Sequence, residues 1–207
     1  MSQVLVLNSS VSGEASASRA LVQSIVDGLK GPGFLIVERD LGADPVPHLT
    51  PETVNTLRGA PPTTPAEIAA RALADSLIAE LKSSDVLVIG APMYNFAIPT
   101  GLKTWFDHVL RAGETFRYSE AGPEGLVKGV RAIVVLSRGG LYSEGPAAAL
   151  DAQEPHLKTL LGFMGVTDVT FVRAEKLGFG LEAREQALAN ARAEIDRIVE
   201  VDFRKAA

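Results

Sequence analysis

Cysteine is absent from the sequence. The chain therefore forms no disulfide, no thiolate metal site and no cysteine redox centre. The three histidines, His48, His108 and His156, lie far apart and lack the short spacing that metal ligands usually have. We therefore predict no metal site, and any redox chemistry must come from a bound cofactor.

Long apolar runs and clusters of basic residues are also missing. No stretch approaches the roughly 20 apolar residues that a membrane-spanning helix needs, and the N-terminal MSQVLVLNSS lacks the basic flank of a signal peptide. The net charge of -5, without a lysine or arginine cluster, argues against binding to the phosphate backbone of a nucleic acid. We expect a cytoplasmic protein with neither a membrane nor a nucleic-acid partner.

What the chain does contain is a regular alternation of apolar runs and amphipathic segments. Five short runs of β-branched and aliphatic residues are typical of parallel strands buried on both faces: residues 4–7, 34–37, 86–89, 133–136 and 169–172. Apolar residues at helical spacing predict helices that begin near Ser18, Pro65, Pro99, Pro155 and Glu182. Proline is favoured at a first helical position because its missing N–H needs no partner there.

This alternation predicts one α/β domain over residues 1–207, with a five-stranded parallel sheet and helices on both faces. A TIM barrel needs eight strand–helix units, and the Gly-x-Gly-x-x-Gly motif of dinucleotide-binding folds is absent after the first strand. We therefore predict a flavodoxin-like three-layer α/β/α sandwich with the strand order 2-1-3-4-5. In this order the loops after the first, third and fourth strands meet at the edge where ligands bind.

These three loops carry complementary chemistry. The serine loop (residues 9–18) precedes a helix N-terminus and offers hydroxyl and N–H donors to a phosphate. The aromatic loop (residues 93–96) offers apolar surface and an amide to a flat ring, and the glycine loop (residues 137–140) lets backbone N–H groups approach developing negative charge. Each loop alone also fits a plain structural role. Together they predict a flat heteroaromatic ring with a phosphate tail, which is FMN.

Longer motifs along the chain carry a family resemblance. They are Pro92-Met93-Tyr94-Asn95-Phe96, Leu102-Lys103, Arg111-Ala112-Gly113, Thr115-Phe116-Arg117-Tyr118, Gly122-Pro123-Glu124-Gly125-Leu126, Ser137-Arg138-Gly139-Gly140 and Leu161-Gly162-Phe163. Together they closely resemble those of the FMN-dependent NADH-azoreductases, also named FMN-dependent NADH:quinone oxidoreductases, over nearly the whole chain. The resemblance implies a homodimer with one FMN per subunit, NADH as the electron donor and active sites at the dimer interface.

The resemblance also implies roles for individual residues. The residues implied to bind the FMN phosphate are Ser10, Ser16, Ala17 and Ser18, and those implied to hold the ring and ribityl chain are Met93, Tyr94, Asn95, Phe96, Ser137, Arg138, Gly139 and Gly140. Tyr118 and Phe163 match aromatic positions of the family's substrate pocket. The chain departs from some relatives at Ala17, at Gly101 and at Tyr142, which replaces a histidine and bears on substrate preference.

The implied reaction is a ping-pong cycle in which NADH reduces the flavin and leaves before the acceptor takes its place. Quinones are then reduced by two electrons to hydroquinones, and aromatic azo compounds are cleaved to amines, with no nucleophilic or essential acid–base side chain. One alternative is a flavodoxin-like FMN electron carrier that works with protein partners, and another is a regulatory domain with an empty site. The excursion over Phe116 to Leu126, which is suited to enclosing a small substrate, favours the enzyme.

Overall fold

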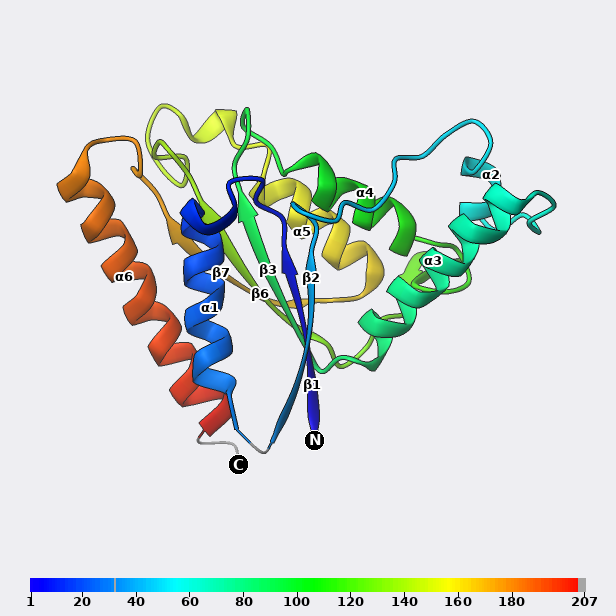
Figure 1. The fold of residues 1–207 in the computed structure, drawn as a ribbon, viewed down its shortest axis with the longest axis horizontal. Coiled ribbons are helices and arrows are strands. Elements are labelled where there is room, and N and C mark those ends of the chain that lie inside the picture. Colours follow the sequence, from blue (N-terminus) through cyan, green and yellow to red (C-terminus); the bar gives the residue numbers. More distant parts are fainter. Residues whose placement is uncertain (32, 205–207) are drawn as a thin grey trace.

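The computed structural model describes residues 1–31 and 33–204, without the side chains of Asp202 and Arg204. Its centre is a parallel sheet of five strands in the order β2-β1-β3-β6-β7 (Figure 1). The strands are β1 (Ser2–Asn8), β2 (Phe34–Asp40), β3 (Val86–Pro92), β6 (Arg131–Ser137) and β7 (Asp168–Ala174). Each strand contains the apolar run that predicted it, and each is longer than that run.

Two further strands, β4 (Phe116–Ser119) and β5 (Gly122–Gly125), pair with each other in antiparallel fashion outside this sheet. The predicted order 2-1-3-4-5 counted sheet strands alone, whereas the chain inserts this hairpin before the fourth of them. Each strand is only four residues long, and β5 contains glycine and proline. Because the aromatic–polar alternation of β4 spans only four residues and β5 has no such pattern, the sequence signalled an excursion there but no strands.

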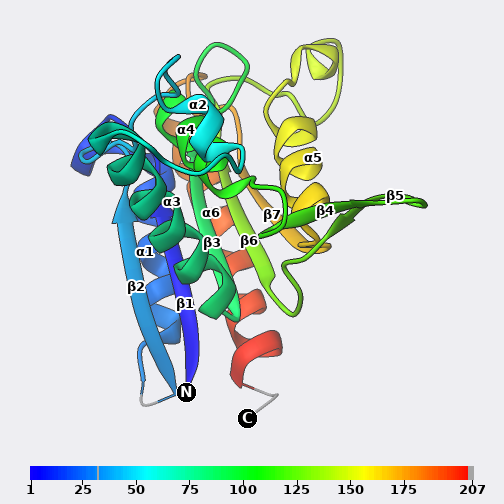
Figure 2. The same cartoon turned by 90° about the vertical axis from the view of Figure 1, so that its right-hand side faces the viewer.

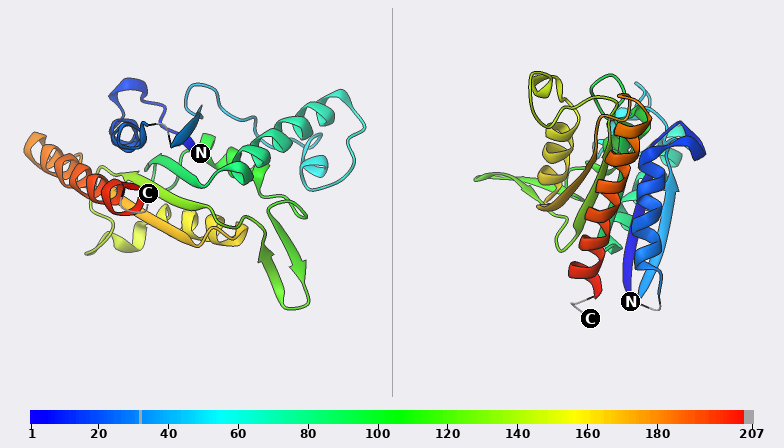
Figure 3. Two further views of the ribbon diagram at one scale, coloured as in Figure 1. Left: turned by 90° about the horizontal axis from the view of Figure 1, so that it is seen from below. Right: turned by 90° about the vertical axis from the view of Figure 1, so that its left-hand side faces the viewer.

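Helices cover both faces of the sheet, as predicted. One face carries α1 (Ala17–Leu29) and α6 (Leu181–Val199), which lie side by side (Figure 3). The other face carries α3 (Pro65–Ser83), α4 (Thr100–Val109) and α5 (Glu154–Met164), with the short α2 (Val54–Leu57) beside α3. Short turns of helix complete the chain at η1 (Gly13–Ala15), η2 (Ala148–Leu150) and η3 (Glu200–Arg204). Two separate apolar clusters fill the space between the sheet and the two helix layers.

Local signals set most of the helix ends. Thr64 and Glu67 form the capping box that opens α3, and Gly165, at φ 99°, ends α5 in the left-handed conformation that favours glycine. The prediction that α4 begins at Pro99 was wrong by one residue. Pro99 precedes the first helical turn with an extended ψ of 145°, and the helix begins at Thr100.

The β4–β5 hairpin projects away from the body of the molecule (Figure 2). Its base is fixed by close backbone packing, because a Cβ atom built on Gly125 would lie 2.2 Å from the backbone nitrogen of Gly165. The neighbouring Val127 N–H donates to the Met164 carbonyl at 2.9 Å. These contacts tie the hairpin to the end of α5. Within the described residues, every helix is too short or too polar to cross a membrane.

Candidate functional site

The three predicted loops meet at the carboxyl edge of the sheet. β3 lies between β1 and β6 and pairs with both, so the aromatic loop lies between the serine loop and the glycine loop. Backbone hydrogen bonds connect the three. The Ser9 N–H donates to the Gly90 carbonyl at 3.2 Å, and the Met93 N–H donates to the Ser137 carbonyl at 2.9 Å.

The serine loop ends in an open helix N-terminus. Ser16 caps α1 by accepting a hydrogen bond from the Arg19 N–H at 3.2 Å, and its hydroxyl lies 3.1 Å from that of Ser18. Ala17 and Ser18 are the first two residues of α1, and no acceptor in the described part of the chain receives their N–H groups. Free N–H groups at the positive end of a helix dipole favour an anion. Ala17 contributes through its backbone alone.

The aromatic loop is built on a tight two-residue turn. Tyr94 and Ala97 exchange two backbone hydrogen bonds, of 3.0 and 3.1 Å. Between them, Asn95 and Phe96 have φ angles of 48° and 70°, as in the primed turns that connect antiparallel strands. Asparagine tolerates this conformation, but phenylalanine is strained in it. The side chains of Asn95 and Phe96, at the tip of this turn, are both exposed.

Tyr94 lies differently from its neighbours, because its hydroxyl reaches back to the serine loop. The hydroxyl accepts a hydrogen bond from the Val11 N–H at 3.2 Å and lies 3.3 Å from the Ser10 hydroxyl. Burial alone would raise the pKa of Tyr94, but hydrogen bonds from Ser10, Ser12 and the Val11 N–H outweigh it and lower this pKa. Tyr94 and Ser10 therefore join two of the predicted loops directly.

The glycine loop presents its N–H groups on one side. The Gly139 and Gly140 carbonyls accept hydrogen bonds from Gly178 and Lys176 in the segment after β7, at 2.9 and 2.8 Å. The two glycine N–H groups have no acceptor among the residues that the structure describes. Such N–H groups are the donors that stabilise negative charge in a bound ligand.

Arg138, which is also predicted to contact the cofactor, has its side chain in the protein interior. The side chain is buried, with 1% of the residue exposed. Its Nε donates to Gln153 at 2.9 Å, Nη1 to Glu175 at 3.0 Å and Nη2 to Asp151 at 2.9 Å. Because all three guanidinium nitrogens have protein partners, the side chain stabilises the loops from the protein interior.

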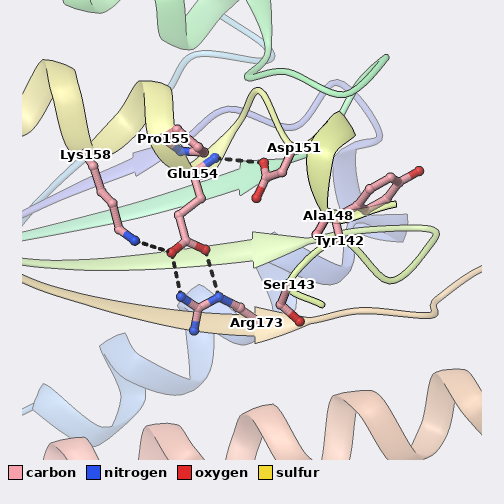
Figure 4. Close-up of a pocket in the computed structure, with 8 residues that line it drawn as sticks. All are labelled: Tyr142, Ser143, Ala148, Asp151, Glu154, Pro155, Lys158 and Arg173. Atoms are coloured by element: carbon pink, nitrogen blue, oxygen red, sulfur yellow. Dashed lines mark hydrogen bonds and ion pairs between the residues drawn. The ribbon is translucent and has the colours of Figure 1, made fainter. Parts of the chain in front are cut away.

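No sequence pattern identified these partners, which lie in loops and at the start of α5. The same segments line a cavity of about 460 Å³ beside Tyr142 (Figure 4). In this cavity Glu154 accepts hydrogen bonds from Arg173 and forms an ion pair with Lys158. Burial alone would raise the pKa of Glu154, but the hydrogen bonds from Arg173 and Lys158 outweigh it and lower the pKa to about 2.

The predicted substrate-pocket aromatics form two groups. Tyr142 packs edge-on against Phe96 at the sheet edge, with ring centroids 6.0 Å apart. Tyr118 and Phe163 both contact Phe116 at the hairpin base, at 5.6 and 4.6 Å. No ring contact joins the two groups within the described chain. Tyr118 is 74% exposed on the projecting hairpin.

The donors at this edge fit FMN. An anion-binding helix start stands at one end, an exposed aromatic turn in the middle and two free backbone N–H groups at the other end. A ligand with a phosphate tail and a flat ring edged by carbonyl oxygens matches the order of these groups along the edge of the sheet. Among the described residues there is no cluster of His, Asp and Glu that could hold a metal ion.

Comparisons with known proteins agree with this arrangement. A family model of a flavodoxin-like fold matches residues 2–199. The FMN-dependent NADH:quinone oxidoreductase of Hyphomonas neptunium is 58% identical over 202 residues, which covers 97% of each chain. The protein of the same name from Ralstonia nicotianae is 49% identical over 201 residues, covering 95% of this chain and 97% of its own.

Solved structures give the same result. The azoreductase of Bacillus anthracis strain Sterne superposes with a TM-score of 0.88 and 29% identity, over 96% of this chain and 99% of its own. An FMN-dependent NADH-azoreductase of Bacillus anthracis strain Ames Ancestor, solved in complex with FMN, has a TM-score of 0.85 and 25% identity. That match covers 96% of this chain and 100% of the other.

Proposed function

Because the chain belongs to the flavodoxin-like family of FMN-dependent NADH:quinone oxidoreductases, we propose that the carboxyl edge of its sheet binds FMN and there passes electrons from NADH to quinones. Aromatic azo compounds are the second class of acceptor, in line with the azoreductases among its structural neighbours. When bound, FMN supplies the two-electron chemistry that no side chain of this cysteine-free protein provides. The protein supplies position and electrostatics.

The serine loop holds the phosphate. The N–H groups of Ala17 and Ser18 point out of the start of α1, and the hydroxyls of Ser10, Ser16 and Ser18 add donors without adding charge. Arg19, in the same turn of helix, forms an ion pair with Asp40, so its charge is already balanced. The phosphate therefore relies on the helix dipole and neutral donors.

The aromatic and glycine loops hold the ring. Met93 and Phe96 provide apolar surface, and the Asn95 amide both donates and accepts. The N–H groups of Gly139 and Gly140 face the negative charge that develops when the ring is reduced. By analogy with oxyanion holes, each such donor contributes about 2.7–4 kcal/mol.

A second copy of the chain completes the substrate pocket. The hairpin projects from the body of its own subunit (Figure 2). Its Tyr118 is 74% exposed, which suits an aromatic wall for a neighbour's site better than one for its own. Phe163 lies at the base of the same hairpin through its contact with Phe116. In the homodimer, Tyr118 and Phe163 face the partner's flavin, while Tyr142 stays beside its own.

The observation that carries this proposal is the row of free donors along one edge, from the N-terminus of α1 to the glycine loop. We further propose that residues 1–207 act as one domain and work in the cytoplasm, where NADH is available as the donor. The relative that was solved with FMN supports the choice of cofactor.

Anaerobic stopped-flow mixing of the FMN-reconstituted protein with NADH, followed by benzoquinone, tests the proposal. Rapid bleaching of the flavin absorption by NADH and its return with quinone support the oxidoreductase. If FMN binds but NADH leaves it oxidised, the protein is an electron carrier that needs a reductase partner. If the protein retains no FMN, the proposed site is wrong.

A further inference from the structure

Arg138 connects the ends of two strands with the segment that precedes α5. It follows β6 directly, it donates to Glu175 just beyond β7, and it donates to Asp151 and Gln153 before α5. Its own backbone N–H donates to the Ala174 carbonyl at 2.9 Å, and its carbonyl accepts from the Leu177 N–H at 3.1 Å. This residue therefore lies at the centre of the contacts beneath the glycine loop.

One arm of these contacts reaches the aromatic loop. The Gln153 amide accepts from Arg138 and donates through Nε2 to the Ala91 carbonyl in β3 at 2.9 Å. The adjacent Ala152 N–H donates to the Phe96 carbonyl at 3.1 Å. The strained turn at Phe96 is thus held in place by the segment that Arg138 anchors.

The other arm fixes the chain that follows the glycine loop. Glu175, which pairs with Arg138, also accepts from the Tyr142 N–H at 2.8 Å and from the Ser143 N–H at 3.0 Å. The hydroxyl of Ser143 donates to the same carboxylate. Glu175 therefore sets the position of Tyr142 relative to Gly139 and Gly140.

The neighbouring cations are already paired, so they cannot take over the role of Arg138. Arg173 and Lys158 lie near, but both pair with Glu154. Asp151 and Glu175 each have about 10% of their side chains exposed and share Arg138 as their cation. Without Arg138, two largely buried carboxylates would lose their cation and keep only hydrogen bonds from neutral donors, which is unfavourable.

We propose that Arg138 is a positioning residue for FMN. Its guanidinium holds the aromatic loop and the glycine loop at a fixed spacing, and it does so through Gln153 and Glu175 without touching the cofactor. This inference rests on the proposed function, because it concerns the same FMN site. A planar group with donors in three directions is required, which arginine provides and lysine does not.

The test compares FMN binding by R138Q, R138K and the control R111Q, measured by the quenching of flavin fluorescence. Arg111 is the matched control because it is also buried, with 3% exposed, and pairs with Asp75 and Glu114 away from the three loops. We expect R138Q to raise the dissociation constant of FMN about tenfold or more, the equivalent of one lost charge-assisted hydrogen bond. R138K, which keeps the charge, should recover only part of this loss.

R111Q should lower the melting temperature and change the FMN dissociation constant by less than about twofold. A folded R138Q that binds FMN as tightly as the wild type overturns the inference. So does a full rescue by R138K, because charge alone would then suffice. Failure of the wild type to bind FMN counts against the proposed function instead.

Hydrogen exchange of the apoprotein provides a readout that does not need FMN. If Arg138 positions the loops, R138Q should speed the exchange of the Tyr94, Ala97 and Ala152 amides more than that of amides in the central strands. If R138Q does not fold, Q153M breaks the arm to Ala91 and takes its place in both measurements. If Q153M instead accelerates the exchange of all amides equally and leaves the FMN affinity unchanged, Arg138 only stabilises the fold and does not position the loops.

Discussion

The hydroxyl of Tyr94, after β3, accepts a hydrogen bond from the backbone N–H of Val11, after β1, at 3.2 Å. This contact joins the turn that is expected to hold the flavin ring to the loop that is expected to hold its phosphate. Because the Ser10 hydroxyl lies 3.3 Å from the same oxygen, one side chain sets the spacing between two parts of the site.

Replacing Tyr94 with Phe should therefore destabilise the apoprotein by about 1 kcal/mol, the usual net value of a hydrogen bond. Urea denaturation measures the change. Tyr142→Phe is the control, because the Tyr142 hydroxyl has no hydrogen-bond partner among the described residues, and it should alter stability by less than about 0.5 kcal/mol. Equal effects of the two substitutions would show that the link through Val11 contributes nothing.

The positive φ of Phe96 predicts an unusual stability order. Phe96→Asn and Phe96→Ala both lose the ring contact with Tyr142, but asparagine tolerates the left-handed conformation and alanine does not. We expect the Asn variant to be more stable than the Ala variant by about 1 kcal/mol. Thermal denaturation of the two apoproteins tests this order. Both variants should show a higher KM for quinones, since both lack the exposed ring.

The lowered pKa of Glu154 predicts how the stability of the fold changes at acid pH. Its pKa is lowered to about 2 in the folded state from an ordinary value of 4.5, so its ionised form stabilises the fold above about pH 4.5. This stabilisation is lost as the pH falls toward 2. The stability difference between wild type and Glu154→Gln should therefore be greatest near neutral pH and shrink over that range. Glu185→Gln, at an exposed position without an ion pair in the described chain, is the control.

His108 predicts a second pH effect, in a different range. The side chain is buried, with Nδ1 at 3.0 Å from the Thr104 carbonyl, and burial lowers its pKa from the ordinary 6.5. Below about pH 6.5 the unfolded chain binds a proton that the folded chain does not, so stability falls as the pH decreases. His108→Leu should reduce this slope, with His156, whose pKa is also lowered by burial, providing the remainder. The exposed His48→Asn is the control. An unchanged slope in His108→Leu would contradict the prediction.

The projecting hairpin predicts a change in assembly. Tyr118→Ser removes an exposed ring that we place against the partner subunit, so the dimer should dissociate at higher protein concentration than the wild type. Light scattering during a dilution series measures the shift. Thermal stability of the monomer should be preserved, because a side chain that is 74% exposed contributes little to its own subunit. A wild type that is monomeric at all concentrations would refute the proposed dimer.

Much of the fold follows from local patterns. Buried parallel strands are apolar along their whole length, and the helices carry their apolar residues at helical spacing, so both kinds of element were predictable from the chain. Glycine at position 101 has a tertiary reason, because a Cβ there would lie 2.6 Å from the Leu41 carbonyl. The β4–β5 hairpin was not predictable, since its strands are only four residues long, β5 has no apolar alternation and the hairpin base is held by contacts with α5.

The sequence by itself determined the parallel α/β sheet, the three loops at one edge and the residue types that suit FMN, because these depend on periodicity and on the chemistry of neighbouring residues. Only the tertiary structure decided what Arg138 does. A motif places Arg138 next to two glycines in the chain, but its side chain turns inward to Asp151, Gln153 and Glu175. Those partners lie 13 to 37 residues away. A buried charge requires charged or hydrogen-bonding partners. Here these partners are distant along the chain, and no local pattern in the sequence identifies them.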